Sequence, residues 1–239
     1  MASGIQRHAN FYNFRVTESL EQLHNGLNKF IRDNNGKMSV AYSEQVPGET
    51  KRLESFASEL PPKSNILEIG FNGGHGACTM LYANRHAKVI SFDIGHYYDD
   101  CGQFGYKYLQ QHYPDRIKLI LGSSRITVPE FSKANPEMKF DLIFIDGDHT
   151  RVGAKDDIMN CRSVSHNNTI VVVDDEGSPR GRIIEPASSV VPYTEWSKEM
   201  SGSGPMFAWV ELLNKGIIEE SGREIYEPGR GLVWGKYTF

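Results

Sequence analysis

The stretch Ile66–Gly76, which reads ILEIGFNGGHG, is an apolar run that leads directly into a glycine-rich turn. The apolar run predicts a buried strand, and the glycines let the backbone turn sharply and approach a ligand closely. The dinucleotide fingerprint G-x-G-x-x-G is absent, because Asn72 stands at the place of its second glycine. Glu68 precedes the first glycine. The stretch therefore predicts a nucleotide-type loop that suits a ligand carrying positive charge.

The composition is that of an ordinary globular protein. The chain has 239 residues, of which 39% are hydrophobic and 23% charged, enough for one large domain with a full core. The net charge of −4 gives no electrostatic reason to expect nucleic acid or an anionic membrane as a partner. The three cysteines lack metal-binding spacing, and no apolar run approaches the roughly 18 residues of a membrane helix. We expect a cytoplasmic protein with a small-molecule partner, and homodimer formation stays open.

Hydrophobic periodicity predicts two helices, over 16–31 and 48–60, followed by a regular alternation of strands and helices. The strands are expected over 65–69, 88–93, 117–121, 140–145 and 169–173, and the helices over 75–85, 103–113, 127–134 and 153–164. The strands are continuous apolar runs, which indicates burial on both faces. The alternation predicts an α/β fold with a parallel, doubly wound, Rossmann-like sheet and helices on both faces.

The alternation ends after residue 176. Serine, glycine and proline are frequent in 176–205, which predicts an irregular loop. A helix over 206–214 and two strands, 217–219 and 231–239, follow, with turns around Gly222 and Pro228-Gly229. We expect a single domain over 1–239. It divides into a helical cap segment (1–60), a cofactor-binding core (61–175), an acceptor-loop region (176–205) and a closing helix and strands (206–239).

Acidic residues follow several predicted strands, at the edge where open α/β sheets bind ligands. Asp93 ends the second strand about 20 residues beyond the glycine turn, the usual reach to a ribose. Asp146 follows the strand 140–145, and Asp174 and Asp175 follow the strand 169–173. If these strands are neighbours, the carboxylates converge and favour a cation such as Mg²⁺ or Mn²⁺ between them. The alternative for each acid is a helix cap or a solvent-exposed position.

Other polar residues stand beside these acids in the sequence. His149 could act as a general base toward a hydroxyl, or it could be structural. Ser124, after the strand 117–121, could meet an adenine edge or only stabilise a turn. His75, in the glycine turn, fits packing or ligand lining better than catalysis.

Together these residues resemble the class I S-adenosylmethionine-dependent methyltransferases, over roughly residues 38–239. The segment 68–74 is similar to the first motif of that family. The run FDLIFIDGDH at 140–149 is similar to the signature of a subgroup that includes small-molecule O-methyltransferases and relatives of the macrocin and cephalosporin-pathway enzymes. The resemblance implies a seven-stranded sheet with an antiparallel last strand, and S-adenosyl-L-methionine as the cofactor.

The resemblance also implies roles for individual residues. The expected cofactor-binding residues are Ala41, Ser43, Glu68, Gly70, Asn72, Gly76, Asp93, Ser124 and Asp146. In catechol and caffeoyl-CoA O-methyltransferases, residues at the positions of Asp146, Asp174 and Asp175 bind a divalent metal, with an asparagine at the last position. His149 stands where those enzymes have a basic lysine.

The predicted function is therefore a methyltransferase that methylates a small-molecule hydroxyl with help from Mg²⁺ or Mn²⁺, with Asp146 and His149 as catalytic residues. The aromatic residues Tyr193, Trp196, Phe207 and Trp209 are candidates to wall the acceptor, or else pack in the core. One alternative is a metal-independent methyltransferase acting on nitrogen, sulfur or oxygen. Others are a protein that holds the cofactor without turnover and, with the wrong glycine spacing, an NAD-dependent oxidoreductase.

Overall fold

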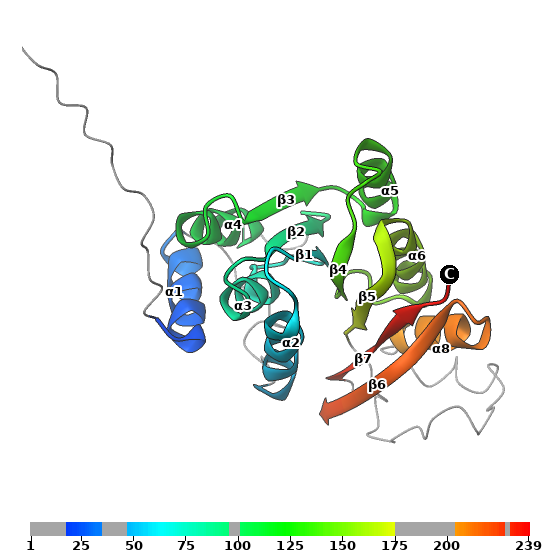
Figure 1. Ribbon diagram of the computed structural model, residues 1–239. Coiled ribbons are helices and arrows are strands. Elements are labelled where there is room, and N and C mark those ends of the chain that lie inside the picture. Colours follow the sequence, from blue (N-terminus) through cyan, green and yellow to red (C-terminus); the bar gives the residue numbers. More distant parts are fainter. Residues whose placement is uncertain (1–17, 35–46, 96–100, 175–203, 228–229) are drawn as a thin grey trace, which may run out of the picture.

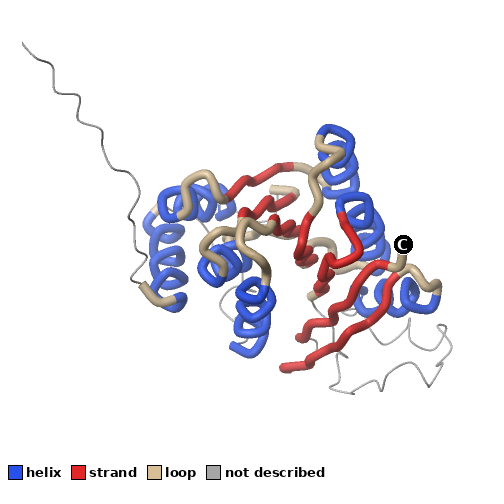
Figure 2. Tube along the Cα trace, in the orientation of Figure 1, coloured by secondary structure: helices blue, strands red, loops and turns tan. Residues whose placement is uncertain are grey.

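The computed structural model describes residues 18–34, 47–95, 101–174, 204–227 and 230–239. They form a seven-stranded sheet with the order β3-β2-β1-β4-β5-β7-β6 (Figures 1 and 2). The strands are β1 Asn65–Ile69, β2 Lys88–Asp93, β3 Ile117–Leu121, β4 Phe140–Ile145, β5 Ser165–Val173, β6 Ile218–Glu227 and β7 Arg230–Tyr237. Strands β1 to β5 are parallel, and β7 runs antiparallel to both β5 and β6. The predicted Rossmann-like sheet with an antiparallel last strand is confirmed.

Helices cover both faces of the sheet (Figure 1). They are α1 Leu20–Asp33, α2 Pro47–Glu59, α3 His75–Ala83, α4 Cys101–His112, α5 Ser124–Ala134, α6 Arg151–Cys161, the 3-10 helix η2 Arg162–Val164, and α8 Gly204–Asn214. Helices α2, α3 and α4 share one core with the sheet, and α1 packs on α3 and α4. Helices α5, α6 and α8 share the core on the other face. None of these helices has the length and apolar character needed to cross a membrane.

The strands supply both cores because successive residues point to opposite faces. Ile66 and Leu142 lie in one core, Leu67 and Ile143 in the other, and all four are fully buried. Each such side chain contributes about 1.5–3 kcal/mol on burial. The sheet is therefore a firm frame whose carboxyl edge can hold side chains in fixed positions.

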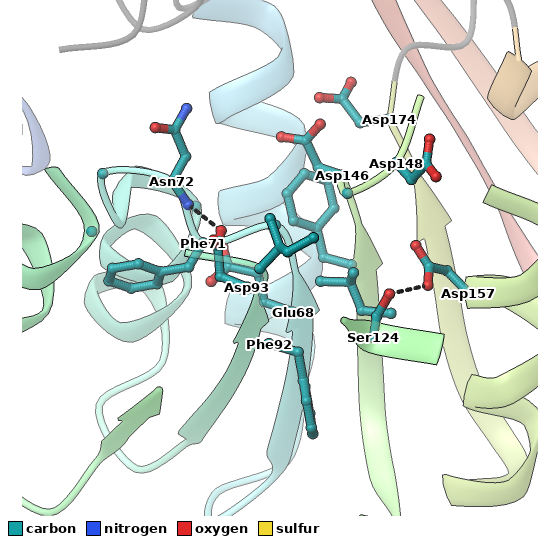
Figure 3. A pocket seen from close by; sticks show the side chains of 18 of the residues that line it. Glu68, Phe71, Asn72, Phe92, Asp93, Ser124, Asp146, Asp148, Asp157 and Asp174 are labelled. Atoms are coloured by element: carbon teal, nitrogen blue, oxygen red, sulfur yellow. Dashed lines mark hydrogen bonds between the residues drawn. The ribbon is translucent and has the colours of Figure 1, made fainter. Parts of the chain in front are cut away.

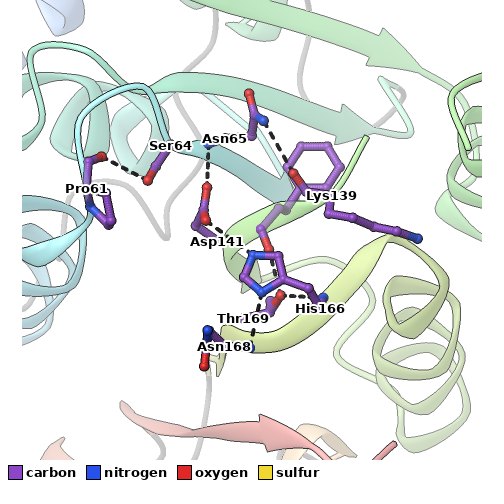
Figure 4. A network of polar contacts seen from close by, with 9 residues as sticks. Pro61, Ser64, Asn65, Lys139, Asp141, His166, Asn168 and Thr169 are labelled. Carbon is purple, nitrogen blue, oxygen red and sulfur yellow. Dashed lines mark hydrogen bonds and ion pairs between the residues drawn. The ribbon is translucent and has the colours of Figure 1, made fainter. Parts of the chain in front are cut away.

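A polar network ties together the amino ends of β1, β4 and β5 (Figure 4). Asp141 accepts the Asn65 N–H at 2.9 Å, and its other oxygen lies 3.2 Å from His166 Nε2. The Asn168 N–H donates to His166 Nδ1 at 3.1 Å, so the neutral ring carries its proton on Nε2 and donates to Asp141. The first aspartate of the FDLIFIDGDH run thus joins three strands at the edge away from the glycine turn.

Helix α2 is fastened to the hairpin β6–β7. The Arg52 guanidinium pairs with Glu224 and lies over the Trp234 ring, 5.2 Å from its centroid. Phe56 meets the same ring edge-on at 5.3 Å. Helix α2, which comes early in the described chain, is in this way held by β6 and β7, its last two strands.

Strands β1 to β4 have the predicted bounds, whereas other elements differ. Helix α5 begins at Ser124, earlier than predicted, because Ser123 takes the N-cap position with an extended backbone. Strand β5 begins at Ser165, where an irregular register with β4 lengthens it beyond its apolar run. Helix α1 begins at Leu20, where Ser19 and Gln22 form a capping box.

The predicted turn at Gly222 is wrong. Gly222 lies inside β6, opposite Trp234 and at a register shift of the ladder. A Cβ there would lie 2.5 Å from the indole ring. The glycine makes room for the ring, and the alternating polar residues of β6 hid the strand from a search for apolar runs.

Candidate active site

Gly70 lies where the ends of three neighbouring strands meet. Its φ is +93°, and its N–H donates to the Phe92 carbonyl at 2.8 Å. The Asp146 N–H donates to the Ile69 carbonyl at 2.8 Å, which brings the loop after β4 against the turn. A Cβ on Gly70 would lie 1.8 Å from the Asp146 carbonyl oxygen. Both the backbone conformation and the neighbouring strand therefore require glycine.

A cavity of about 780 Å³ opens at the carboxyl edge of the sheet (Figure 3). The predicted residues Glu68, Gly70, Asn72, Gly76, Asp93 and Ser124 line it, and so do Asp146, His149 and Asp174. The structure thus brings together every predicted catalytic, cofactor-binding and metal-binding residue that it describes. Ala41, Ser43, Asp175, Tyr193 and Trp196 lie outside the described residues, as does most of the segment 176–205.

Of the aromatic candidates for the acceptor wall, Phe207 and Trp209 are on α8. Trp209 is fully buried in the core, and its Nε1–H donates to Glu220 at 2.9 Å. Neither side chain lines the cavity in the part of the chain that the structure describes. Trp209 is a core residue, which is the alternative that its helical spacing favoured.

Asp93, at the end of β2, is held by two backbone N–H groups. Asn72 donates to Oδ2 at 2.9 Å, and Gly95 donates to Oδ1 at 2.7 Å. Asn72 has a φ of +47°, so the turn itself adopts an uncommon conformation to make this bond. A carboxylate has about four acceptor sites, so both oxygens can accept further hydrogen bonds. Fixed in this way, Asp93 suits the two hydroxyls of a ribose.

Glu68 is a fully buried carboxyl group at the floor of the cavity. Ser91 donates to its Oε2 at 2.5 Å, while Oε1 has no hydrogen-bond partner among the described residues. Burial raises the pKa of Glu68 to about 8. Ser91 opposes that rise, Asp146 and Asp93 add to it, and the nearby Ala77 N–H lowers it without forming a hydrogen bond to Oε1. A Cβ on Gly76 would lie 2.4 Å from Oε1. The space left by the absent side chain of Gly76 and the unpartnered Oε1 of Glu68 together fit a cationic ligand group, such as an ammonium.

The raised pKa of Glu68 makes stability depend on pH. An unfolded glutamate ionises near pH 4.5, whereas the native group keeps its proton until about pH 8. Between these values, rising pH stabilises the unfolded state by up to about 1.4 kcal/mol per pH unit. Glu68→Gln removes this pH-dependent loss of native-state stability. The free energy of unfolding of the variant should therefore rise relative to that of the wild type as pH increases from 5 to 8. Urea denaturation of both proteins across this range tests it. A difference that does not change with pH would contradict the prediction.

Asp146 and Asp174 follow adjacent strands at the carboxyl edge. Ile145 pairs with Val173 in the ladder, and the Asp174 N–H donates to the Ile145 carbonyl at 2.9 Å. Figure 3 shows the two side chains next to one another. Asp146 Oδ1 also lies 3.3 Å from His149 Nε2. The candidate base and its carboxylate partner are therefore already in contact.

The metal site predicted from the sequence is not supported by the described part of the chain. Within it, no group of three or more His, Cys, Asp or Glu side chains could hold a metal ion. Asp146 and Asp174 supply two carboxylates, and the third predicted ligand, Asp175, lies outside the described residues.

Some cavity residues were not predicted. Glu49, Thr50 and Leu53 come from α2, and Arg230, whose guanidinium lies 3.8 Å from the Glu49 carboxylate, begins β7. Long-range packing places them, and no local pattern marks them. Asp157 is different, because it occupies a position in the apolar stripe of α6 formed by the buried residues Ala154, Ile158 and Cys161. A charged residue in such a stripe was an available signal.

The comparisons with known proteins agree with this geometry. Residues 67–176 match a family model described as a methyltransferase domain. No match was found among curated proteins.

Solved structures share the fold across nearly the whole chain. An O-methyltransferase from Bacillus cereus in complex with SAH is 14% identical, with 94% of each chain covered and a TM-score of 0.66. An SAH-bound methyltransferase from Podospora anserina is 19% identical, with 92% of this chain and 88% of that chain covered and a TM-score of 0.62. An O-methyltransferase from Streptomyces achromogenes, involved in tomaymycin synthesis and in complex with SAM, is 15% identical, with 95% and 93% covered and a TM-score of 0.64.

Proposed function

We propose that this chain, whose family match and fold support an S-adenosylmethionine-dependent methyltransferase, methylates a hydroxyl group of a small molecule. The observation that carries the proposal is the contact between Asp146 and His149 at the edge of a cavity lined by Glu68 and Asp93. Two of the similar structures are O-methyltransferases. A deprotonating pair beside a cofactor-sized cavity is what transfer to a hydroxyl needs.

The residues of the cavity fit the cofactor. When bound, S-adenosylmethionine supplies a methyl group on a positively charged sulfur, which a nucleophile displaces in line. The orphaned oxygen of Glu68 suits the cationic methionine end, and Asp93 suits the ribose. Gly76 leaves the space that the Glu68 carboxyl group needs, and Gly70 leaves room for the Asp146 backbone carbonyl. Holding both ends of the donor fixes the direction from which an acceptor must approach.

His149 serves as the base. Its Nε2 lies 3.3 Å from Asp146 Oδ1, so a neutral ring protonated at Nε2 would donate to this carboxylate and offer Nδ1 as the base toward an acceptor hydroxyl. The Asp146 carboxylate orients the ring and stabilises the imidazolium that forms. The oxygen becomes a stronger nucleophile as its proton leaves.

Assistance by a divalent cation is the alternative mechanism for the same methyl transfer. The adjacency of Asp146 and Asp174 favours it, and Asp175 would be a further ligand. Mg²⁺ or Mn²⁺ held there would act as a Lewis acid on the acceptor oxygen. A metal-independent transfer to nitrogen or sulfur, and a protein that binds the cofactor without turnover, are the remaining alternatives.

The setting we propose is a cytoplasmic enzyme with a small-molecule acceptor and no nucleic acid or membrane partner. The net charge of −4 supports this, since both excluded partners attract basic surfaces. Homodimer formation stays open.

Binding of the product S-adenosylhomocysteine tests the proposed cofactor. Calorimetry should show binding to the wild type, and Asp93→Ala should weaken it by about 1–3 kcal/mol, because the ribose hydroxyls lose their acceptor. Asp33→Ala, on the exposed surface of α1, is the matched control and should leave the affinity unchanged. If the wild type does not bind at millimolar concentration, the proposed function is wrong.

A further inference from the structure

Asp157 is a buried carboxylate on α6 that lines the cavity, with only 1% of its surface exposed (Figure 3). The Ser124 hydroxyl donates to its Oδ1 at 2.5 Å. Its Oδ2 has no hydrogen-bond partner among the described residues and faces the Gly147 backbone, 3.1 Å from where a Cβ would stand. A buried carboxylate costs stability unless its oxygens are paired or hydrogen-bonded, so a buried carboxylate with an unpartnered oxygen calls for an explanation. The proposed mechanism gives Asp157 none.

Ser124 and Asp157 lie on one side of Asp93, and Asn72 lies on the opposite side (Figure 3). Ser124 begins α5 directly after β3, the neighbour of β2 in the sheet. A nucleoside whose ribose binds Asp93 at the end of β2 would carry its base toward this side of the cavity. Ser124 and Asp157 are thus placed beside the purine, away from the reacting atoms.

The direction of one hydrogen bond decides what this side of the cavity can recognise. A serine hydroxyl has a single proton and two lone pairs, and an ionised carboxylate can only accept. The Ser124 proton is therefore committed to Asp157, and only lone pairs of the hydroxyl remain for a ligand. Such an oxygen can accept a hydrogen bond from an N–H group of a ligand, whereas it repels the lone pairs of a carbonyl oxygen.

We propose that Asp157 is a positioning residue that keeps Ser124 a hydrogen-bond acceptor, so that the site selects a purine with an exocyclic amino group over one with a carbonyl there. The inference rests on the proposed function, because it assumes a nucleoside cofactor in the cavity. Adenine offers the amino group, whereas hypoxanthine offers an oxygen at the same position.

Protonation of Asp157 would weaken this selection. Burial raises the pKa of Asp157 to about 6. The Ser124 hydrogen bond lowers it, Asp148 of the loop after β4 raises it, and Arg125 of α5 lowers it. The Cys161 thiol lies one turn along α6, and its pKa is raised, first by burial and then by the charge of Asp157. Below about pH 6 the carboxyl group becomes a donor itself, and the Ser124 proton is then able to turn toward the ligand.

Calorimetry with S-adenosylhomocysteine and S-inosylhomocysteine tests the proposal. At pH 7.5 we expect the wild type to bind the adenosyl compound at least about 10-fold more tightly, and the ratio to shrink several-fold at pH 5.5. Asp157→Asn and Ser124→Ala should both reduce the ratio at pH 7.5, whereas Ser124→Thr, which keeps the hydroxyl, should preserve it. If Asp157→Asn does not fold, the serine variants and the wild-type pH dependence decide.

The outcomes separate this inference from the function on which it rests. Equal binding of both compounds by the wild type, or a ratio that neither Ser124→Ala nor pH changes, overturns the role of Asp157 and leaves the methyltransferase intact. A wild type that binds neither compound overturns both.

Discussion

Gly70→Ala is expected to lower the free energy of unfolding by about 3 kcal/mol or more. One part of this loss is the φ of +93°, which an alanine adopts only under strain. The larger part is steric, because the new Cβ would stand 1.8 Å from the Asp146 carbonyl oxygen. That oxygen belongs to the backbone, so the ends of β1 and β4 would have to separate. Urea denaturation measures the loss.

Gly216→Ala is the matched control. Gly216 also has a positive φ, +64°, but a Cβ there would meet nothing within 4 Å. It should cost only the conformational penalty, about 1 kcal/mol. If the two variants lose the same stability, the close approach of the strands at Gly70 does not matter energetically.

His149→Ala is expected to lower kcat by about 10²- to 10⁴-fold, the usual contribution of a general base. The His149 side chain is 54% exposed, so its removal should leave folding and S-adenosylhomocysteine affinity nearly unchanged. The measurement is S-adenosylhomocysteine release with an acceptor that the wild type methylates, found by screening small hydroxyl compounds. Asp146→Asn should also lower kcat, by up to about 10⁴-fold, because an asparagine can hold the ring in the wrong tautomer while leaving its position unchanged.

Chelation distinguishes the two forms of the proposed reaction. With His149 as the base, wild-type turnover should survive EDTA. Turnover that stops with EDTA and returns with Mg²⁺ or Mn²⁺, together with an active His149→Ala, would contradict the role of His149 and favour the cation at Asp146 and Asp174.

The sheet could be predicted because its strands are encoded locally. Strands β1, β2 and β4 are apolar runs that are buried on both faces, which leaves one register and clear ends. Strand β3 lies at the sheet edge and is only partly buried, but its apolar run still marked it. Strand β6 is an edge strand with charged residues along it, so the prediction of a strand over 217–219 caught only its first residues. Gly222 read as a turn because the ring of Trp234, which explains it, is supplied by another strand.

The candidate site likewise contains residues that could be predicted from the sequence and residues that could not. Glu68, Asp93, Asp146 and Asp174 follow the strands or end them, so parallel topology alone brings them to one edge. The side of the cavity formed by Glu49 and Arg230 depends on packing between the beginning and the end of the chain. The role of Asp157 depends on which atom holds a proton, which no sequence pattern shows.

The contact of Arg52 with Glu224 also has a consequence for synthesis on the ribosome. The two residues are 172 positions apart, and α2 contributes Glu49, Thr50 and Leu53 to the cavity. At about 5–20 residues per second, the hairpin that holds α2 is made roughly 10–30 s after it. A nascent chain that ends before β6 has its glycine turn and Asp93 but lacks the support for this wall of the cavity. The contacts that support this wall therefore join residues far apart in the sequence, and the complete cavity forms only after the chain has been translated through β6.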